Sequence, residues 1–230
     1  MKIEILRLKE GARRARGLTV IIDVFRAYTV ECALLALGAR EITAVGALED
    51  AWALKRERPD ALLVGERGGW KIEGFDCGNS PSQLERLPVA GRRVIHTTSA
   101  GTQGAALATE ATELLGGALV NARATAAYIR SRQPEAVSLV AMGLDGETPT
   151  DEDELCAEYL RALIRGEAFD VEAGIPKLAQ TTGAKFFDPA RQEAFPRDDF
   201  DRCTQVDRYD FALRLLRMDR GLKVERVDGN

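Results

Sequence analysis

The stretch LTVIIDVFRAYTVECALLALG, residues 18–38, decides the fold of this chain. Its first six residues form a short, almost continuously apolar run, which is typical of a strand covered on both faces. Residues 29–37 then follow a helical period, and Gly38 stands where helices commonly end. The stretch therefore predicts a strand followed directly by a helix, which is half of a βαβ unit.

The same alternation of short apolar runs and helical segments continues to about residue 165. Such alternation is the signature of parallel strands joined by helices, so we predict a three-layer α/β/α fold with a mainly parallel, mixed sheet. The predicted strands span residues 18–23, 41–45, 61–66, 92–97, 118–122 and 136–142. The predicted helices span residues 29–37, 48–57, 81–87, 101–115, 123–132 and 151–165.

The chain after residue 166 is less regular. Residues 211–227 alternate in polarity, which favours a hairpin that turns at residues 219–221 over a short helix at residues 211–218. No repeat or linker interrupts the 230 residues, a length that suits one hydrophobic core. We predict a single domain over residues 1–230, regular from 18 to 165 and less regular from 166 onward.

Composition and charge narrow the function classes. Lys and Arg number 32 against 36 Asp and Glu, and the interspersed signs argue against nucleic acid as a partner. No long uncharged apolar run predicts a membrane span, and the N-terminus lacks the apolar core of a signal peptide. The four cysteines are scattered without a C-x-x-C pair, so the sequence predicts a cytoplasmic protein without a zinc site or disulfide framework.

Polar side chains follow several of the predicted strands. Ligands of open parallel sheets bind beyond the carboxyl ends of the strands, so these side chains are expected at one edge of the sheet. Taken singly, each could be a helix cap, a surface ion pair or a turn residue. Together they predict a site that holds a cation beside an anionic ligand. They include Asp23, Arg26, Glu66, Arg67 and Asn121.

The residue types fit phosphoryl chemistry. Hydrolysis of a phosphate monoester needs charge compensation and an activated water, and a hard divalent cation held by carboxylates supplies both. Arg26 and Arg67 can bind a phosphate, carboxylate or sulfonate through two hydrogen bonds. The residues do not decide which acid is a metal ligand and which is a general base. The candidate acids are Asp23, Glu66, Asp76, Glu152 and Asp153.

Two loops add further candidates. The stretch HTTSAGTQG, residues 96–104, offers Thr97, Thr98 and Ser99 with backbone N–H groups at a helix start, either as a phosphate cradle or as an N-cap. The stretch GFDCGNSP, residues 74–81, carries Asp76 and Asn79 in a polar loop. At residues 150–153, TDED also resembles a capping box, so Glu152 and Asp153 have a purely structural alternative.

Other phosphatase chemistries fit poorly. The positions six residues after the four cysteines hold no arginine, which excludes the cysteine phosphatases. Phe25 stands where a haloacid dehalogenase would carry its second aspartate. His96 is the only histidine, so no histidine pair exists, and a lone histidine at a strand end is more often structural.

The order of these motifs resembles the 2-phosphosulfolactate phosphatase family, also called ComB-like proteins. The resemblance runs from about residue 18 to 159, and its motifs are IIDVFRA, GERGG, GFDCGNSP, HTTSAGTQG, LVNA and TDEDELCAEYL. CTQVDRYDF, near the C-terminus, is a weaker echo. HTTSAGTQG replaces a commoner TTNGT form, and Glu158 stands at a usually small position. These two departures leave the predicted fold unchanged, but they do not support the family's exact substrate for this chain.

The resemblance implies a magnesium-dependent phosphatase that converts 2-phospho-3-sulfolactate to 3-sulfolactate and phosphate, a step of coenzyme M biosynthesis. The alternatives are a phosphatase for another small phosphorylated hydroxy acid and a non-catalytic phosphoester-binding protein on the same fold. A homo-oligomer, most simply a dimer, is expected on base rates. The site is predicted as catalytic Asp23, Glu66 and Asp76; Mg²⁺ ligands among these and Glu152 and Asp153; and substrate-binding Arg26, Arg67, Thr97, Thr98, Ser99, Asn79 and Asn121.

Overall fold

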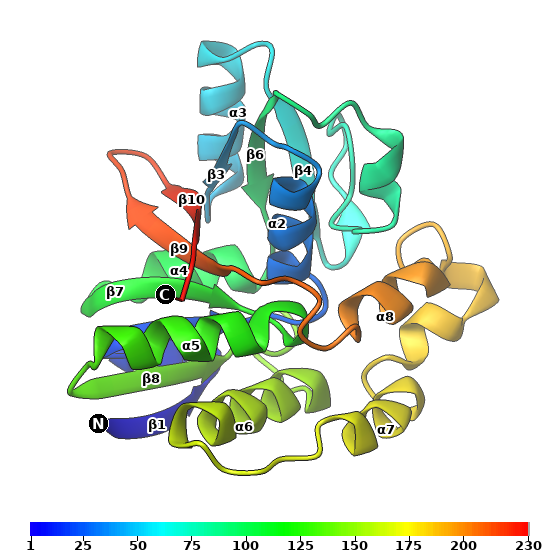
Figure 1. The fold of residues 1–230 in the computed structure, drawn as a ribbon. Coiled ribbons are helices and arrows are strands. Elements are labelled where there is room, and N and C mark those ends of the chain that lie inside the picture. The colour runs from blue at the N-terminus through cyan, green and yellow to red at the C-terminus, as the bar shows by residue number, and fades with distance from the viewer. Residues whose placement is uncertain (230) are drawn as a thin grey trace.

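A mixed, ten-stranded sheet runs through the chain in the computed structural model, which describes residues 1–229 (Figure 1). Helices cover both of its faces, so the predicted three-layer α/β fold is confirmed. The strands are β1 (Lys2–Arg7), β2 (Gly17–Ile22), β3 (Glu41–Ala44), β4 (Leu62–Arg67), β5 (Trp70–Lys71), β6 (Arg93–Thr97), β7 (Ala111–Gly117), β8 (Ala136–Ala141), β9 (Ala212–Arg217) and β10 (Leu222–Val227).

The helices divide between the two faces of the sheet. In Figure 1, α5 and α6 pack in front of β8, while α4 lies behind β7. Eight of the ten residues of α2 are buried, because this helix is apolar on nearly all sides. The helices are α1 (Leu8–Arg14), α2 (Ala27–Ala36), α3 (Leu48–Glu57), α4 (Gly101–Leu107), α5 (Ala122–Arg132), α6 (Asp151–Arg165), α7 (Ile175–Gln180) and α8 (Arg197–Cys203).

The sheet consists of two parallel halves joined by a hairpin. One half has the order β1-β8-β2-β7 and the other the order β3-β6-β4, with the β9–β10 hairpin between them. Three successive antiparallel pairings, β7 with β9, β9 with β10 and β10 with β3, make the two halves run in opposite senses. The sheet is therefore mainly parallel within each half but mixed as a whole.

Strand twist brings the carboxyl ends of the two halves together. Six steps separate β2 from β4 in the strand order, and roughly 20–25° per step turns β4 by about 120–150° relative to β2. In Figure 1, β7 and β8 lie across the view, whereas β4 and β6 run almost vertically. The site therefore forms at a corner between the halves, and not along one straight edge as predicted from the sequence.

Most predicted elements are confirmed within one or two residues, including the C-terminal hairpin, but one region was misread. The predicted helix 101–115 ends at Leu107, and the predicted strand 118–122 lies earlier, as β7. The stretch ATELLGG fits a helical period, yet it pairs with β2 and β9. Gly116 allows this pairing because a Cβ there would come within 2.3 Å of the Tyr28 ring.

Smaller differences concern the ends of other elements. Residues 119–121 form a 3₁₀ turn before α5, where we predicted the end of a strand. The predicted helix 81–87 is reduced to a 3₁₀ turn at Gln83–Arg86. The N-terminal residues add β1, which pairs with β8 at one edge of the sheet.

The segment between α6 and β9 covers one end of the sheet. It contains α7, three 3₁₀ turns (Glu172–Gly174, Ala184–Phe187 and Pro189–Arg191) and α8, drawn yellow to orange in Figure 1. Its own apolar cluster includes Phe186, Phe195 and Phe200, with Phe25 packed against it. We call residues 166–211 the C-terminal cap. Among residues 1–229, no helix combines the length and apolar character that crossing a bilayer requires.

Candidate active site

A cavity of about 260 Å³ lies where the two halves of the sheet meet the C-terminal cap. Asp23 follows β2, Glu66 lies near the end of β4, and Gly143 follows β8, so several strand ends contribute to its wall. Phe195 and Lys185 reach it from the C-terminal cap. Gly69, with φ +85°, packs against Phe195 in the wall, and a Cβ there would come within 2.2 Å of the Phe195 ring.

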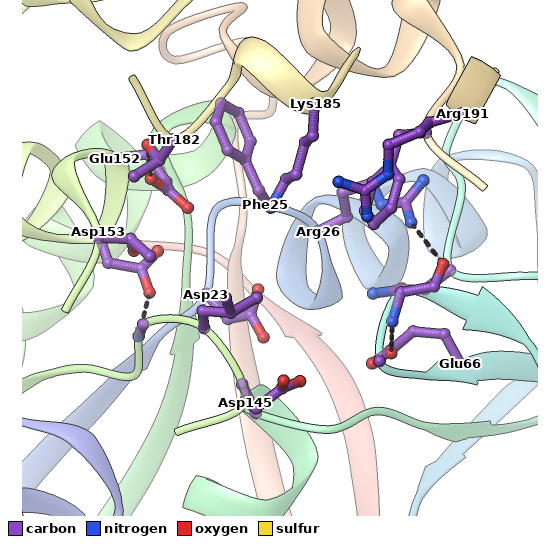
Figure 2. A pocket seen from close by; sticks show the side chains of 18 residues that line it. Asp23, Phe25, Arg26, Glu66, Asp145, Glu152, Asp153, Thr182, Lys185 and Arg191 are labelled. Atoms are coloured by element: carbon purple, nitrogen blue, oxygen red, sulfur yellow. Dashed lines mark hydrogen bonds between the residues drawn. The ribbon is translucent and has the colours of Figure 1, made fainter. Parts of the chain in front are cut away.

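Four buried carboxylates line the cavity, with Glu152 and Asp153 on one side, Glu66 on the other and Asp23 between them (Figure 2). None is more than 6% exposed. Two of them come from the first turn of α6, whose positive dipole end favours negative charge. The four acids are Asp23, Glu66, Glu152 and Asp153.

Backbone N–H groups hold Asp23 and Asp153 in place. The two oxygens of Asp23 accept hydrogen bonds from Ala27 N, at 3.2 Å, and Gly101 N, at 2.8 Å. Those of Asp153 accept from Val24 N and Gly143 N, both at 2.8 Å. Each carboxylate thus ties together two segments, and its oxygens keep further lone pairs for a ligand. The capping box predicted at Thr150 does not form, because Asp153 is engaged elsewhere.

Glu66 is held in the same way from the other half of the sheet. Its Oε1 accepts from Ser99 N at 2.7 Å, and its Oε2 accepts from Gly69 N at 2.6 Å and Ser99 Oγ at 3.1 Å. Three donors on two loops therefore fix one carboxylate at the edge of the cavity.

Burial and mutual repulsion change the acidity of this group. Burial raises the pKa of Asp23 to about 6, and the charges of Glu66 and Glu152 add to the effect. Burial also raises the pKa of Asp153 well above its usual value, with Glu152 and Asp23 contributing. An acid with a pKa near 6 can accept or release a proton close to neutral pH, as general acid–base catalysis requires.

Cationic side chains lie across the cavity from Glu152 and Asp153 (Figure 2). The Lys185 ammonium lies 5.8, 5.6 and 5.3 Å from the ring centres of Phe25, Phe186 and Phe195, and burial lowers its pKa. The Arg191 guanidinium stacks 4.5 Å from the Phe195 ring centre. Within residues 1–229, no carboxylate oxygen lies within 4.0 Å of either charge. Both charges therefore remain available for an anion.

Arg26 also lines the cavity, but it already has a partner. Its Nη1 donates to Asp199 Oδ2 at 2.6 Å, and its guanidinium lies 5.0 Å from the Phe195 ring centre. One amino group of this arginine therefore anchors the C-terminal cap. Its Nη2 makes a long contact, 3.5 Å, to Gly69 O on the cavity wall.

Six of the predicted site residues line this cavity: Asp23, Arg26, Glu66, Asn79, Glu152 and Asp153. The structure does not bring Asp76 or Asn121 to it. Asp76 is exposed and accepts from Leu63 N at 2.7 Å, which fixes its own loop to β4. Asn121 is fully buried and bonds to the backbone of Ala118 and Gly116, so it supports the turn before α5.

Arg67 and Thr97 also lie outside the cavity. Neighbouring residues of a strand point to opposite faces, so Arg67 points away from the side that Glu66 faces. Its guanidinium donates to Glu66 O, Gly46 O and Thr97 Oγ1. Burial lowers the pKa of Arg67. Both residues therefore brace the loops behind Glu66.

The predicted phosphate cradle at residues 96–104 instead holds carboxylates. Its N–H groups are already engaged, because Ser99 N donates to Glu66 and Gly101 N donates to Asp23. Thr98 N donates to Thr102 Oγ1 within the same turn. These residues thus position the acids and do not face a ligand with free donors.

Several lining residues were not predicted from the sequence. Four of them belong to the C-terminal cap, whose sequence has no regular pattern. Four phenylalanines interspersed with basic residues over residues 185–200 were the available signal. Thr182 donates to Glu152 from the same segment. The unpredicted residues include Asp145, Thr182, Lys185, Arg191 and Phe195.

The four acids have donor atoms that suit Mg²⁺. They offer only oxygen donors, which hard cations prefer, and a nearby cation would relieve the repulsion among them. As they stand, no three His, Cys, Asp or Glu side chains within residues 1–229 are grouped closely enough to hold a metal ion. Mg²⁺ commonly takes one or two carboxylates and completes its shell with water and substrate oxygens, so the chemistry of the donors fits.

The fold and the cavity define an α/β protein with a buried polar site, in which acids and unpaired cations face one another. Such a site suits an enzyme acting on a small anionic substrate. The chain belongs to the 2-phosphosulpholactate phosphatase family, a family of phosphoric monoester hydrolases, and the family model matches residues 5–215.

Curated relatives agree with this assignment. A protein of Bacillus subtilis is 31% identical over 213 residues, which cover 91% of this chain and 92% of the relative. One of Deinococcus radiodurans is 43% identical over 148 residues, but the match covers only 63% of this chain and 62% of that protein. One of Carboxydothermus hydrogenoformans is 38% identical over 165 residues, 71% of this chain and 68% of the relative. Each is named a probable 2-phosphosulfolactate phosphatase.

Proposed function

We propose that this chain is a magnesium-dependent phosphatase that hydrolyses 2-phospho-3-sulfolactate to 3-sulfolactate and phosphate. The observation that carries the proposal is the cavity itself, where four buried acids face two cations without acidic partners. The family and the names of the relatives support the reaction class. The details of metal and substrate are our inference.

The cations favour a substrate with more than one negative group. Phosphosulfolactate carries a phosphate, a carboxylate and a sulfonate, and the cavity offers Arg26, Lys185 and Arg191 to meet them. Arginine can bind such groups bidentately, whereas the lysine acts as a point charge. The enclosed volume also limits the substrate to a small molecule. Another phosphorylated hydroxy acid remains the second candidate, because it would use the same cations.

The acids would hold the metal. Mg²⁺ would be bound by carboxylates among Asp23, Glu66, Glu152 and Asp153, and when bound it supplies positive charge to the phosphate and lowers the pKa of a bound water. Asp76 is not retained in the proposed site, since it is exposed and turned to β4.

The chain's own residues then position the reactants. Lys185 and Arg191 orient the anionic substrate, while the phenylalanines around Lys185 keep water away from its charge. Asp23, with its pKa near 6, accepts a proton from the attacking water. Water attacks phosphorus as the ester P–O bond breaks; the leaving oxygen takes up a proton from solvent, and Asp23 releases its proton to solvent.

A phosphate-release assay tests the proposal. Purified protein is incubated with phosphosulfolactate, phospholactate or phosphoglycolate, with Mg²⁺ or with a chelator, and kcat/KM is compared among substrates. We expect phosphosulfolactate to give the highest value and the chelator to abolish turnover. Release of no phosphate from any substrate, together with persistent calorimetric binding of an intact phosphoester, would instead identify a binding protein. The cytoplasmic location, the coenzyme M pathway and the dimer stay predictions from the sequence.

A further inference from the structure

His96 and Glu31 form a fully buried pair beneath the cavity. His96 Nδ1 lies 2.9 Å from Glu31 Oε1, and both side chains are 0% exposed. Glu31 comes from α2 and His96 from β6, so the pair also joins a helix to the sheet. Glu31 Oε2 has no hydrogen-bond partner within residues 1–229. A buried polar atom left in this way costs free energy, which calls for an explanation beyond packing.

The pair reaches the cavity through Asn79. His96 Nε2 lies 3.2 Å from Asn79 Oδ1, and Asn79 lines the cavity while being only 4% exposed. A continuous row of side chains therefore runs from Glu31 through His96 to Asn79. The other end of the Asn79 amide is left to face the ligand.

The protons on His96 decide which end of the amide faces the ligand. If both ring nitrogens carry a proton, Nδ1 donates to the Glu31 carboxylate and Nε2 donates to Asn79 Oδ1. The Asn79 NH₂ group then points to the cavity. If Nε2 is unprotonated, it must accept from that NH₂ group, and Asn79 Oδ1 points to the cavity instead. A proton on Nε2 is therefore what leaves the Asn79 NH₂ group free to donate to a phosphate.

We propose that His96, held by Glu31, is a positioning residue that turns the Asn79 NH₂ group toward the cavity, where it donates to an oxygen of the phosphorylated ligand. The contact between Glu31 Oε1 and Nδ1, at 2.9 Å, fixes the ring so that Nε2 faces Asn79 Oδ1 at 3.2 Å. The identity of the ligand rests on the proposed function. The orientation of Asn79 does not.

A double-mutant cycle tests the coupling between the pair and Asn79. Glu31→Gln keeps the size and a hydrogen bond to Nδ1 but removes the charge, so it is expected to fold. His96→Leu removes both ring hydrogen bonds. Each is made in the native protein and in Asn79→Ala, and the Kd for inorganic phosphate is measured by calorimetry. Glu113→Gln, in β7 and outside the cavity, is the matched control.

With Asn79 present, we expect Glu31→Gln and His96→Leu each to weaken phosphate binding about tenfold, the value of one hydrogen bond to a charged group. In Asn79→Ala, the same changes should alter Kd less than about twofold, because their effect passes through Asn79. Glu113→Gln should leave Kd unchanged. Urea denaturation of every variant reports folding separately, and Glu31→Gln alone can complete the cycle if His96→Leu does not fold.

Equal losses in both backgrounds would overturn the proposal, because they would indicate a structural role that does not act through Asn79. So would unchanged binding in Glu31→Gln, or a native protein that does not bind phosphate at all. Turnover of phosphosulfolactate is measured in parallel. Native protein that binds phosphate with the expected coupling but releases none from the substrate would contradict the proposed function and leave the positioning role standing.

Discussion

Arg26 Nη1 lies 2.6 Å from Asp199 Oδ2, and this ion pair joins residues 173 positions apart in the sequence. Their side chains are 3% and 0% exposed. The second oxygen of Asp199 accepts from Ser80 Oγ and from Ser82 N, both at 2.9 Å. One carboxylate therefore ties together the loop after β2, the loop after β5 and helix α8. The C-terminal cap is fastened over the cavity by this contact.

Asp199→Ala is expected to destabilise the protein by about 3–5 kcal/mol, because it leaves the Arg26 guanidinium buried without its partner. Urea denaturation measures the change in the free energy of unfolding. The matched control is Asp198→Ala, one residue earlier on the same helix and exposed, which should change stability by no more than about 0.5 kcal/mol. Equal effects at the two positions would show that the buried ion pair does not hold the cap.

Lys185→Met is expected to raise KM for a phosphorylated substrate about tenfold or more. Methionine keeps an unbranched side chain between the phenylalanine rings and removes only the charge, so packing should change little. Lys177→Met is the control, since Lys177 is 70% exposed and pairs with Asp151 outside the cavity. Steady-state kinetics on both variants measure the effect. A similar KM in both would remove Lys185 from the substrate site.

Asp23→Asn is expected to change how stability depends on pH. The folded-state pKa of Asp23, about 6, lies above its usual value of 3.8, so the folded protein binds more protons between these values. Stability should therefore fall by roughly 3 kcal/mol as the pH rises from about 4 to 6. Asp153, whose pKa is also raised, acts in the same direction.

Thermal melts of the metal-free protein between about pH 4 and 6 measure how stability depends on pH, and Asp23→Asn should make this dependence weaker. The control, Asp198→Asn, removes an exposed carboxyl group and should leave the pH dependence of stability unchanged. If the stability of the native protein instead rises with pH, the prediction is wrong, because the acids would then be stabilised as anions by groups other than those described above.

Local patterns in the sequence were enough to predict most elements. The run of residues 18–22 predicts β2 because both faces of that strand are covered, and the alternation near residue 220 predicts the C-terminal hairpin. β7 was missed because its pairing depends on distant partners, including the Tyr28 ring over Gly116. The opposite senses of the two half-sheets were not predictable either, since they depend on where β9 and β10 insert.

In the candidate site, too, residues with a local sequence signal were predicted and residues that depend on distant contacts were not. Asp23 and Glu66 were predicted because strand ends place polar groups at the site. Glu152 and Asp153 were predicted from an acidic helix start, although that motif taken alone favours the capping alternative. Lys185 reaches the cavity only through tertiary packing of the cap, which leaves no periodic signal. Residues 96–104 were predicted to bind phosphate, but they position acids instead, because their N–H groups donate to Glu66 and Asp23.

Asp76 and Glu66 provide the sharpest comparison, because they flank the same hairpin and had equal standing in the sequence. Asp76→Asn should leave kcat/KM within about twofold, since an asparagine oxygen can still accept from Leu63 N and the residue lies outside the cavity. Glu66→Gln should lower kcat/KM about 100-fold or more, because it removes a buried charge that faces the reacting groups.

Phosphate release with and without added Mg²⁺ measures both variants, and denaturation checks that each is folded. Glu66→Gln should also need more Mg²⁺ for half-maximal activity, if its carboxylate contributes to the metal site. The reverse order, with Asp76→Asn the more damaged enzyme, would move the site to the loop of residues 74–81. Unchanged turnover and Mg²⁺ dependence in both variants would place the reaction outside this cavity altogether.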